Sequence, residues 1–89
     1  MLDKNLIGNK MMYYADLVHD LGWICQTFRK EHGYLQKDIA KDLGIQQTTV
    51  SNFETGVSKS SDTFIWYIMH GLTAKYIIDK RRYKANERI

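Results

Sequence analysis

The chain has 89 residues, of which 44% are hydrophobic, and its formal net charge is +3. This length suits one small globular domain, and no apolar run approaches the ~18 residues of a membrane span, so we expect neither a membrane segment nor a secretion leader. The single cysteine, Cys25, cannot form an internal disulfide, which favours a reducing cytoplasm and a small buried hydrophobe at this position.

Glycines separate a series of helical patterns, and no strand alternation or internal repeat appears. Four helices are predicted, each followed by a glycine, and Thr73 can cap a fifth that runs to about Arg82. The predicted spans are Asp20–His32, Gln36–Leu43, Gln46–Thr55 and Asp62–His70. The sequence therefore predicts an all-α, five-helix domain.

Residues 1–19 precede these patterns and form an N-terminal extension. Hydrophobic residues at helical spacing predict that residues 11–19 either lengthen the first helix or form a short leading one. Met11 and Met12 are alternative translation starts.

The second and third predicted helices are joined by a tight turn at Gly44. Ile39, Ala40 and Leu43 form a buried stripe on the second helix. Gly44 supplies the left-handed backbone that ends this helix. The pattern is typical of a helix-turn-helix.

The third helix carries a polar face that a core does not need. Val50 and Phe53 anchor it, and hydrogen-bonding side chains lie opposite them on a helical wheel. These side chains are uncharged and both donate and accept hydrogen bonds, as base edges in a major groove require. They are Thr48, Ser51, Asn52 and Thr55, with Gln47 on the flank.

Together these positions resemble the Cro/C1-type helix-turn-helix family of phage repressors and bacterial regulators. The resemblance covers residues 20–72 and rests on the spacing of a set of residues, namely Arg29, Gln36, Ala40, Gly44, Val50, Glu54 and Gly56. It implies a compact bundle of the lambda-repressor-like DNA-binding type.

The resemblance and the helical wheel together assign roles to side chains. The third helix would enter the major groove and present four side chains to bases, namely Gln47, Thr48, Ser51 and Asn52. Gln36, Lys37 and Lys59 would lie near phosphates.

The resemblance also implies an ion pair between Arg29 and Glu54, which ties the first helix to the end of the third. We expect an exposed pair that fixes helix geometry and adds little stability; alternatively, Arg29 is a solvated surface charge. Two positions depart from the family pattern, because Leu35 and Gln46 occupy sites where Ser or Thr would cap a helix.

The fourth helix is apolar without interruption from residue 64 to residue 69. The wheel predicts that Phe64, Ile65, Ile68 and Leu72 face the core. Trp66 and His70 would then project from the opposite side, with Tyr67 on a flank. We interpret these three residues as a candidate dimer contact, with cover by the N-terminal segment as the alternative.

The basic residues are concentrated in the C-terminal segment. Residues 73–89 have a net charge of +4, whereas residues 1–72 have a net charge of −1. Lys80, Arg81 and Arg82 either attract DNA phosphates or form a solvated helix end.

Motifs of catalysis and metal binding are not found. His19, His32 and His70 lie far apart without partner ligands, so no metal, cofactor or small-molecule ligand is expected. The loop serines have no recognisable base, and Ser61 or Asp62 is expected to cap the fourth helix. An enzyme is not predicted.

We therefore interpret the protein as a cytoplasmic transcriptional regulator that binds specific double-stranded DNA, a phage-like repressor acting as a homodimer on a palindromic operator. One alternative is an interaction protein, an antitoxin or phage-encoded inhibitor, that binds a protein through residues 62–70 or the tail. Another is a non-specific nucleoid-type binder that uses the tail.

Overall fold

The computed structural model describes residues 20–87, with side chains to residue 83, and this part of the chain is helical without strands. The predicted all-α fold is confirmed. A helix that includes residues 20–32 is followed by α2 (Gln36–Leu43), α3 (Gln47–Glu54), α4 (Ser61–Met69) and α5 (Ala74–Glu87). The predicted extension over residues 1–19 lies outside the described residues.

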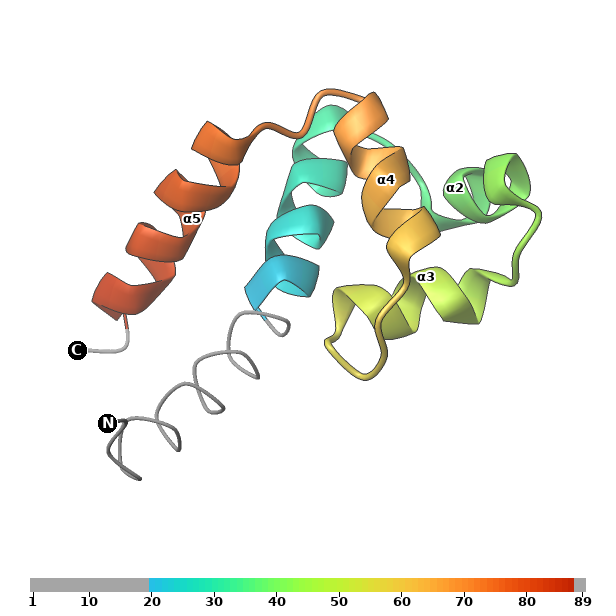
Figure 1. The fold of residues 1–89 in the computed structure, drawn as a ribbon, viewed down its shortest axis with the longest axis horizontal. Coiled ribbons are helices and arrows are strands. Elements are labelled where there is room, and N and C mark those ends of the chain that lie inside the picture. The colour runs from blue at the N-terminus through green and yellow to red at the C-terminus, as the bar shows by residue number, and fades with distance from the viewer. Residues whose placement is uncertain (1–19, 88–89) are drawn as a thin grey trace, which may run out of the picture.

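The 20–32 helix stands at the centre of the arrangement (Figure 1). Helices α2, α3 and α4 lie on one side of it, and α5 lies on the other. The described helices include none that is both long and apolar enough to cross a membrane.

The core forms where the 20–32 helix meets the helix-turn-helix and α4. Its buried hydrophobic members are Ile24, Cys25, Phe28, Ile39, Ala40, Val50, Phe53, Trp66, Tyr67 and Leu72. Burial raises the pKa of the Cys25 thiol to about 12, with a smaller contribution from the negative charge of Glu54. Cys25 is thus a small buried hydrophobe, as predicted.

Two glycines allow geometry that a side chain would prevent. Gly44 has a φ of 65° and ends α2 in the left-handed region, as predicted. At Gly22 the reason is contact, because a Cβ there would lie 2.3 Å from the carbonyl oxygen of Phe53. Gly22 therefore lets the 20–32 helix touch the end of α3.

The helix caps agree with the sequence at two positions and differ at a third. Leu35 and Gln46 make no side-chain capping hydrogen bond, as expected. For α4 the cap is Ser60, and not Ser61 or Asp62, because the Ser60 Oγ accepts the Thr63 N–H at 3.3 Å. This residue has an extended backbone (φ −143°, ψ 100°), which lets its side chain turn back over the first turn.

The predicted orientation of α4 is wrong. Trp66 is 5% exposed and Tyr67 fully buried, whereas Ile65, Ile68 and Met69 are 51%, 48% and 78% exposed. Of the predicted core set only Leu72 is buried, with 4% exposed, and Phe64 is half-buried. The candidate dimer contact at Trp66 and Tyr67 therefore lies inside the domain.

The physical reason is that both buried aromatic residues find partners for their polar atoms. The Trp66 indole N–H donates to Asp42 of α2 at 3.1 Å, and the Tyr67 hydroxyl donates to Glu54 of α3. His70, which is exposed, stacks on Trp66 with ring centroids 3.7 Å apart. Large aromatic rings with satisfied polar ends bury more apolar area than the aliphatic residues left outside.

Helix α5 is fastened to the 20–32 helix by polar contacts. The Tyr76 hydroxyl donates to Glu31 at 2.8 Å, and Lys80 pairs with the same carboxylate at 3.1 Å. Arg81 lies 3.9 Å from Asp20. Lys80 and Arg81 thus lie close to carboxylates of the 20–32 helix, which neither interpretation of the basic tail predicted. Helix α5 itself lies on the side of that helix away from α3 (Figure 1).

The two faces of α4 should respond differently to truncation. We expect Trp66→Ala to lower the free energy of unfolding by about 3–5 kcal/mol, because it leaves a cavity and an unpaired Asp42 contact. Met69→Ala, on the exposed face of the same helix, should change it by less than about 0.5 kcal/mol. Urea denaturation followed by circular dichroism measures both, and equal losses would contradict the orientation of α4.

Candidate nucleic-acid interface

The outer face of α3 presents the side chains that the sequence predicted for it. Gln47, Thr48 and Asn52 are exposed, and Ser51 is half-buried. On the opposite face Val50 is fully buried and Phe53 is 6% exposed. The helix therefore separates an apolar packing face from an uncharged, hydrogen-bonding outer face.

The C-terminal end of α3 is fixed by the buried carboxylate of Glu54. Arg29 Nε donates to one of its oxygens at 2.9 Å and the second guanidinium nitrogen donates to the other at 3.2 Å. The Tyr67 hydroxyl donates to the same carboxylate. Three helices, the 20–32 helix, α3 and α4, thus meet at one side chain.

The Arg29–Glu54 pair forms, but the expected exposure is wrong. Side-chain exposure is 10% for Arg29 and zero for Glu54. Desolvation opposes the charge of Arg29, yet the hydrogen bond and attraction of Glu54 outweigh it and raise the pKa of Arg29. Burial, followed by the hydrogen bond to Glu54, raises the pKa of Tyr67.

A hydrogen-bonded chain extends from this carboxylate to the surface. Gln36 Nε2 donates to Glu54 at 3.0 Å, and Gln47 Nε2 donates to Gln36 Oε1 at 3.4 Å. Gln36 therefore has a positioning role that the sequence did not predict, because its amide links the buried network to Gln47. The carbonyl oxygen of Gln47 and one of its N–H groups stay available to a ligand.

A basic groove of about 520 Å³ lies beside the N-terminal end of α3. It brings together the predicted residues Gln36, Lys37 and Gln47. The other lining residues are Gln26, Arg29, Lys30 and Leu35, of which Gln26 and Lys30 had no predicted role. Only the packing of the 20–32 helix against the start of α2 could have placed these two in the groove, and the sequence carries no local signal for that contact.

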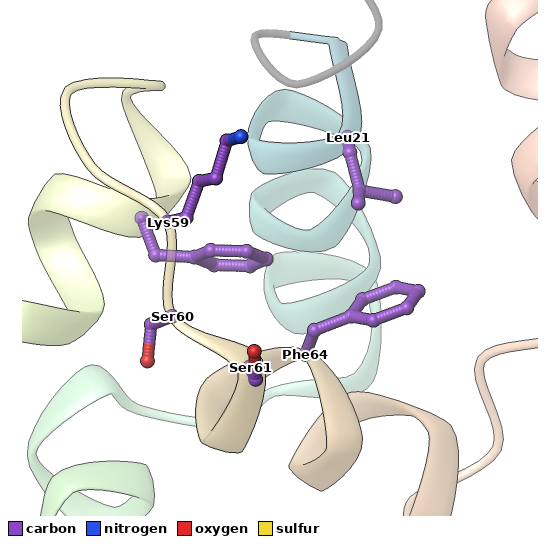
Figure 2. Close-up of a pocket in the computed structure, with 6 residues that line it drawn as sticks. Leu21, Lys59, Ser60, Ser61 and Phe64 are labelled. Carbon is purple, nitrogen blue, oxygen red and sulfur yellow. The ribbon is translucent and has the colours of Figure 1, made fainter.

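Lys59 lies elsewhere. It follows the C-terminal end of α3 in the loop to α4, where it is exposed and lines a second pocket with Phe53 and Phe64 (Figure 2). The predicted phosphate contacts thus fall at the two ends of α3, with the candidate base-reading side chains between them.

Comparison with known proteins identifies the class of this fold. Residues 26–68 match the family model described as Helix-turn-helix, which spans the second half of the 20–32 helix, α2, α3 and most of α4. Over these residues the resemblance to the Cro/C1-type helix-turn-helix family is confirmed.

Two relatives carry the same name. The chain is 39% identical over 44 residues to "Antitoxin HipB" of Escherichia coli O6:H1, a match that covers 49% of this chain and 47% of that protein. It is 36% identical over 44 residues to "Antitoxin HipB" of Escherichia coli strain K12, with 49% and 50% covered. The match thus spans about half the length of these relatives. No solved structure matches the chain significantly.

The buried carboxylate should contribute strongly to stability. Glu54→Gln should lower the free energy of unfolding by about 3–5 kcal/mol, because it leaves the Arg29 guanidinium buried beside a neutral amide. Tyr67→Phe removes one hydrogen bond to a charged group and should cost about 1–3 kcal/mol.

Glu31→Gln is the matched control for Glu54→Gln, because it alters an exposed carboxylate that also accepts from a tyrosine and a basic residue. It should leave the unfolding midpoint in urea almost unchanged. A Glu54→Gln variant as stable as Glu31→Gln would contradict the assigned role.

Proposed function

We propose that the protein binds a specific double-stranded DNA sequence, with α3 in the major groove, and acts as a transcriptional regulator. The observation that carries this proposal is the outer face of α3, where uncharged hydrogen-bonding side chains are presented by a helix fixed from behind at Glu54. A rigid scaffold of this kind positions side chains for base contacts before the duplex arrives.

Within this face, Gln47 and Asn52 are the main readers. Each side-chain amide can donate an N–H to adenine N7 and accept from the adenine N6 amino group with its oxygen, so A·T pairs are expected in each half-site. Gln47 occupies the first position of α3, the end that enters the groove deepest, and its contact with Gln36 limits its rotamers. Thr48 and Ser51 contact neighbouring bases.

Phosphate contacts flank these readers. Gln36 and Lys37 approach one phosphate at the start of α2, with Lys30 in the same groove, and Lys59 approaches another beyond the end of α3. Such contacts set the register of the domain on the duplex and carry no sequence information.

The regulator is proposed to be a repressor that binds a palindromic operator as a homodimer. An α3 of 8 residues reads few base pairs, and a dimer doubles the site length through two half-sites. Since Trp66 and Tyr67 are buried, the contact surface available on α4 is its exposed aliphatic face, formed by Ile65, Ile68 and Met69.

A second candidate function is that of an antitoxin which binds a protein partner. The name of both relatives favours it, and the exposed aliphatic face of α4 offers an apolar surface for a partner. In that case the same face would bind a different protein and not a second copy of this chain, and DNA binding by α3 would be secondary.

Substitutions on α3 should separate specificity from affinity. Gln47→Ala and Asn52→Ala should each cost about 1–3 kcal/mol of binding free energy on the preferred duplex and relax the choice of base at one position per half-site. Lys59→Ala should weaken binding to all duplexes about equally and reduce the log–log salt slope by about one. Fluorescence anisotropy on matched and single-mismatch duplexes, at two salt concentrations, measures these effects.

Lys75→Ala, on exposed α5, is the matched control for Lys59→Ala and should leave both affinity and salt slope unchanged. If Gln47→Ala and Asn52→Ala preserve affinity and base preference, α3 is not the reader. The antitoxin function would then be the better account.

A further inference from the structure

A pocket of about 260 Å³ lies behind the reading face, where α3 ends and α4 begins. Its lining comes from the 20–32 helix, from α3, from the loop between α3 and α4, and from the start of α4. The lining residues are Leu21, Phe53, Lys59, Ser60, Ser61 and Phe64 (Figure 2).

The floor and walls of the pocket are apolar. The rings of Phe53 and Phe64 are tilted by 41° with centroids 6.5 Å apart, and Leu21 approaches from the 20–32 helix. Leu21 and Phe64 are only half-buried, so apolar surface faces water here. A small apolar group placed against Leu21 and Phe64 would remove that surface from water, which is favourable.

The rim of the pocket is polar and positively charged. Lys59 is exposed and forms no ion pair with a described residue, and no described lining residue is acidic. The Ser60 hydroxyl accepts the Thr63 N–H, and Ser61 lies at the start of α4, whereas the Lys59 side chain extends away from it toward the 20–32 helix (Figure 2). The N-terminal end of the 9-residue α4 adds partial positive charge at the same rim.

We propose that this pocket binds a small amphipathic carboxylate. An aryl or short alkyl tail would lie against Leu21 and Phe64, and the carboxylate would pair with Lys59. Ligand pockets of drug-sized molecules typically exceed ~300 Å³, so a single ring with a short acidic side chain fits this smaller volume better than a larger effector.

Occupancy of the pocket would regulate the proposed DNA binding. Lys59 is the proposed phosphate contact beyond α3, and a carboxylate that holds its ammonium group competes with a DNA phosphate for the same charge. This consequence rests on the proposed function, whereas the binding of the carboxylate does not.

The binding claim is tested without DNA. Titration of the isotope-labelled full chain with 3-phenylpropionate should shift NMR signals of Leu21, Phe53 and Phe64, with a Kd on the order of 1 mM for a ligand of this size. The neutral 3-phenylpropanamide has the same shape and should bind about two- to fivefold more weakly, the range of one exposed ion pair.

Lys59→Met keeps the aliphatic stem and removes the charge, so it should bring the carboxylate and the amide to equal affinity. Lys75→Met is the matched control and should preserve the difference. The proposal is overturned if the amide binds wild type as well as the carboxylate does, or if no pocket signal shifts. It is also overturned if nuclear Overhauser contacts show residues before Asp20 filling the pocket.

The regulatory claim is tested separately. Saturating 3-phenylpropionate should weaken binding of the preferred duplex by about two- to fivefold in wild type and leave Lys59→Met unaffected. If the carboxylate shifts the pocket signals but leaves DNA affinity unchanged, competition at Lys59 is wrong while the pocket stands. If no duplex is bound at all, the proposed function fails, and the titration without DNA still decides the pocket.

Discussion

The arrangement of this domain depends on one buried carboxylate. Glu54 ends α3 and accepts hydrogen bonds from Arg29 of the 20–32 helix, from Gln36 of α2 and from Tyr67 of α4. A charge removed from water is costly unless every lone pair is satisfied, so the four helices have few alternative ways to pack once Glu54 is inside. The orientation of α3 follows from this requirement.

The same constraint links stability to the proposed reading face. The carboxylate lies at the C-terminal end of α3, yet its hydrogen-bonded chain passes through Gln36 to Gln47 at the N-terminal end. Gly22 assists by allowing the 20–32 helix to touch the last turn of α3. Both ends of this 8-residue helix are therefore held. The N-terminal end has no side-chain cap, and packing replaces it, whereas at the C-terminal end the Thr55 hydroxyl donates to the carbonyl oxygen of Ser51 at 3.0 Å.

Local features of the fold could be predicted from the sequence, because they are decided within a few residues. The tight end of α2 requires a left-handed backbone, which the glycine at position 44 allows. The positions of Val50 and Phe53 among polar residues determine which side of α3 faces the core. The candidate reading face follows directly, since an amphipathic helix has only one outer side.

Features that depend on contacts between helices could not be predicted in this way. Helix α4 is apolar on all sides, so a helical wheel does not show which face is buried. The buried face is the one that carries Trp66 and Tyr67, because these side chains find hydrogen-bond acceptors at Asp42 and Glu54. Burial of the Arg29–Glu54 pair and the position of Lys30 in the basic groove depend likewise on how the 20–32 helix packs. The spacing of residues within one helix does not determine these contacts between helices.

The central claim is that α3, held in place by the hydrogen bonds to Glu54, recognises a base sequence, and that two copies of α3 in a homodimer recognise two symmetric half-sites. Its most direct test is selection of bound duplexes from a random DNA library by the full chain. The account predicts a two-fold symmetric consensus with A·T pairs in each half-site and half-site centres about 10 base pairs apart, or a multiple of that spacing. Recovery of duplexes without enrichment over the starting library, from a chain shown to be folded, would contradict it.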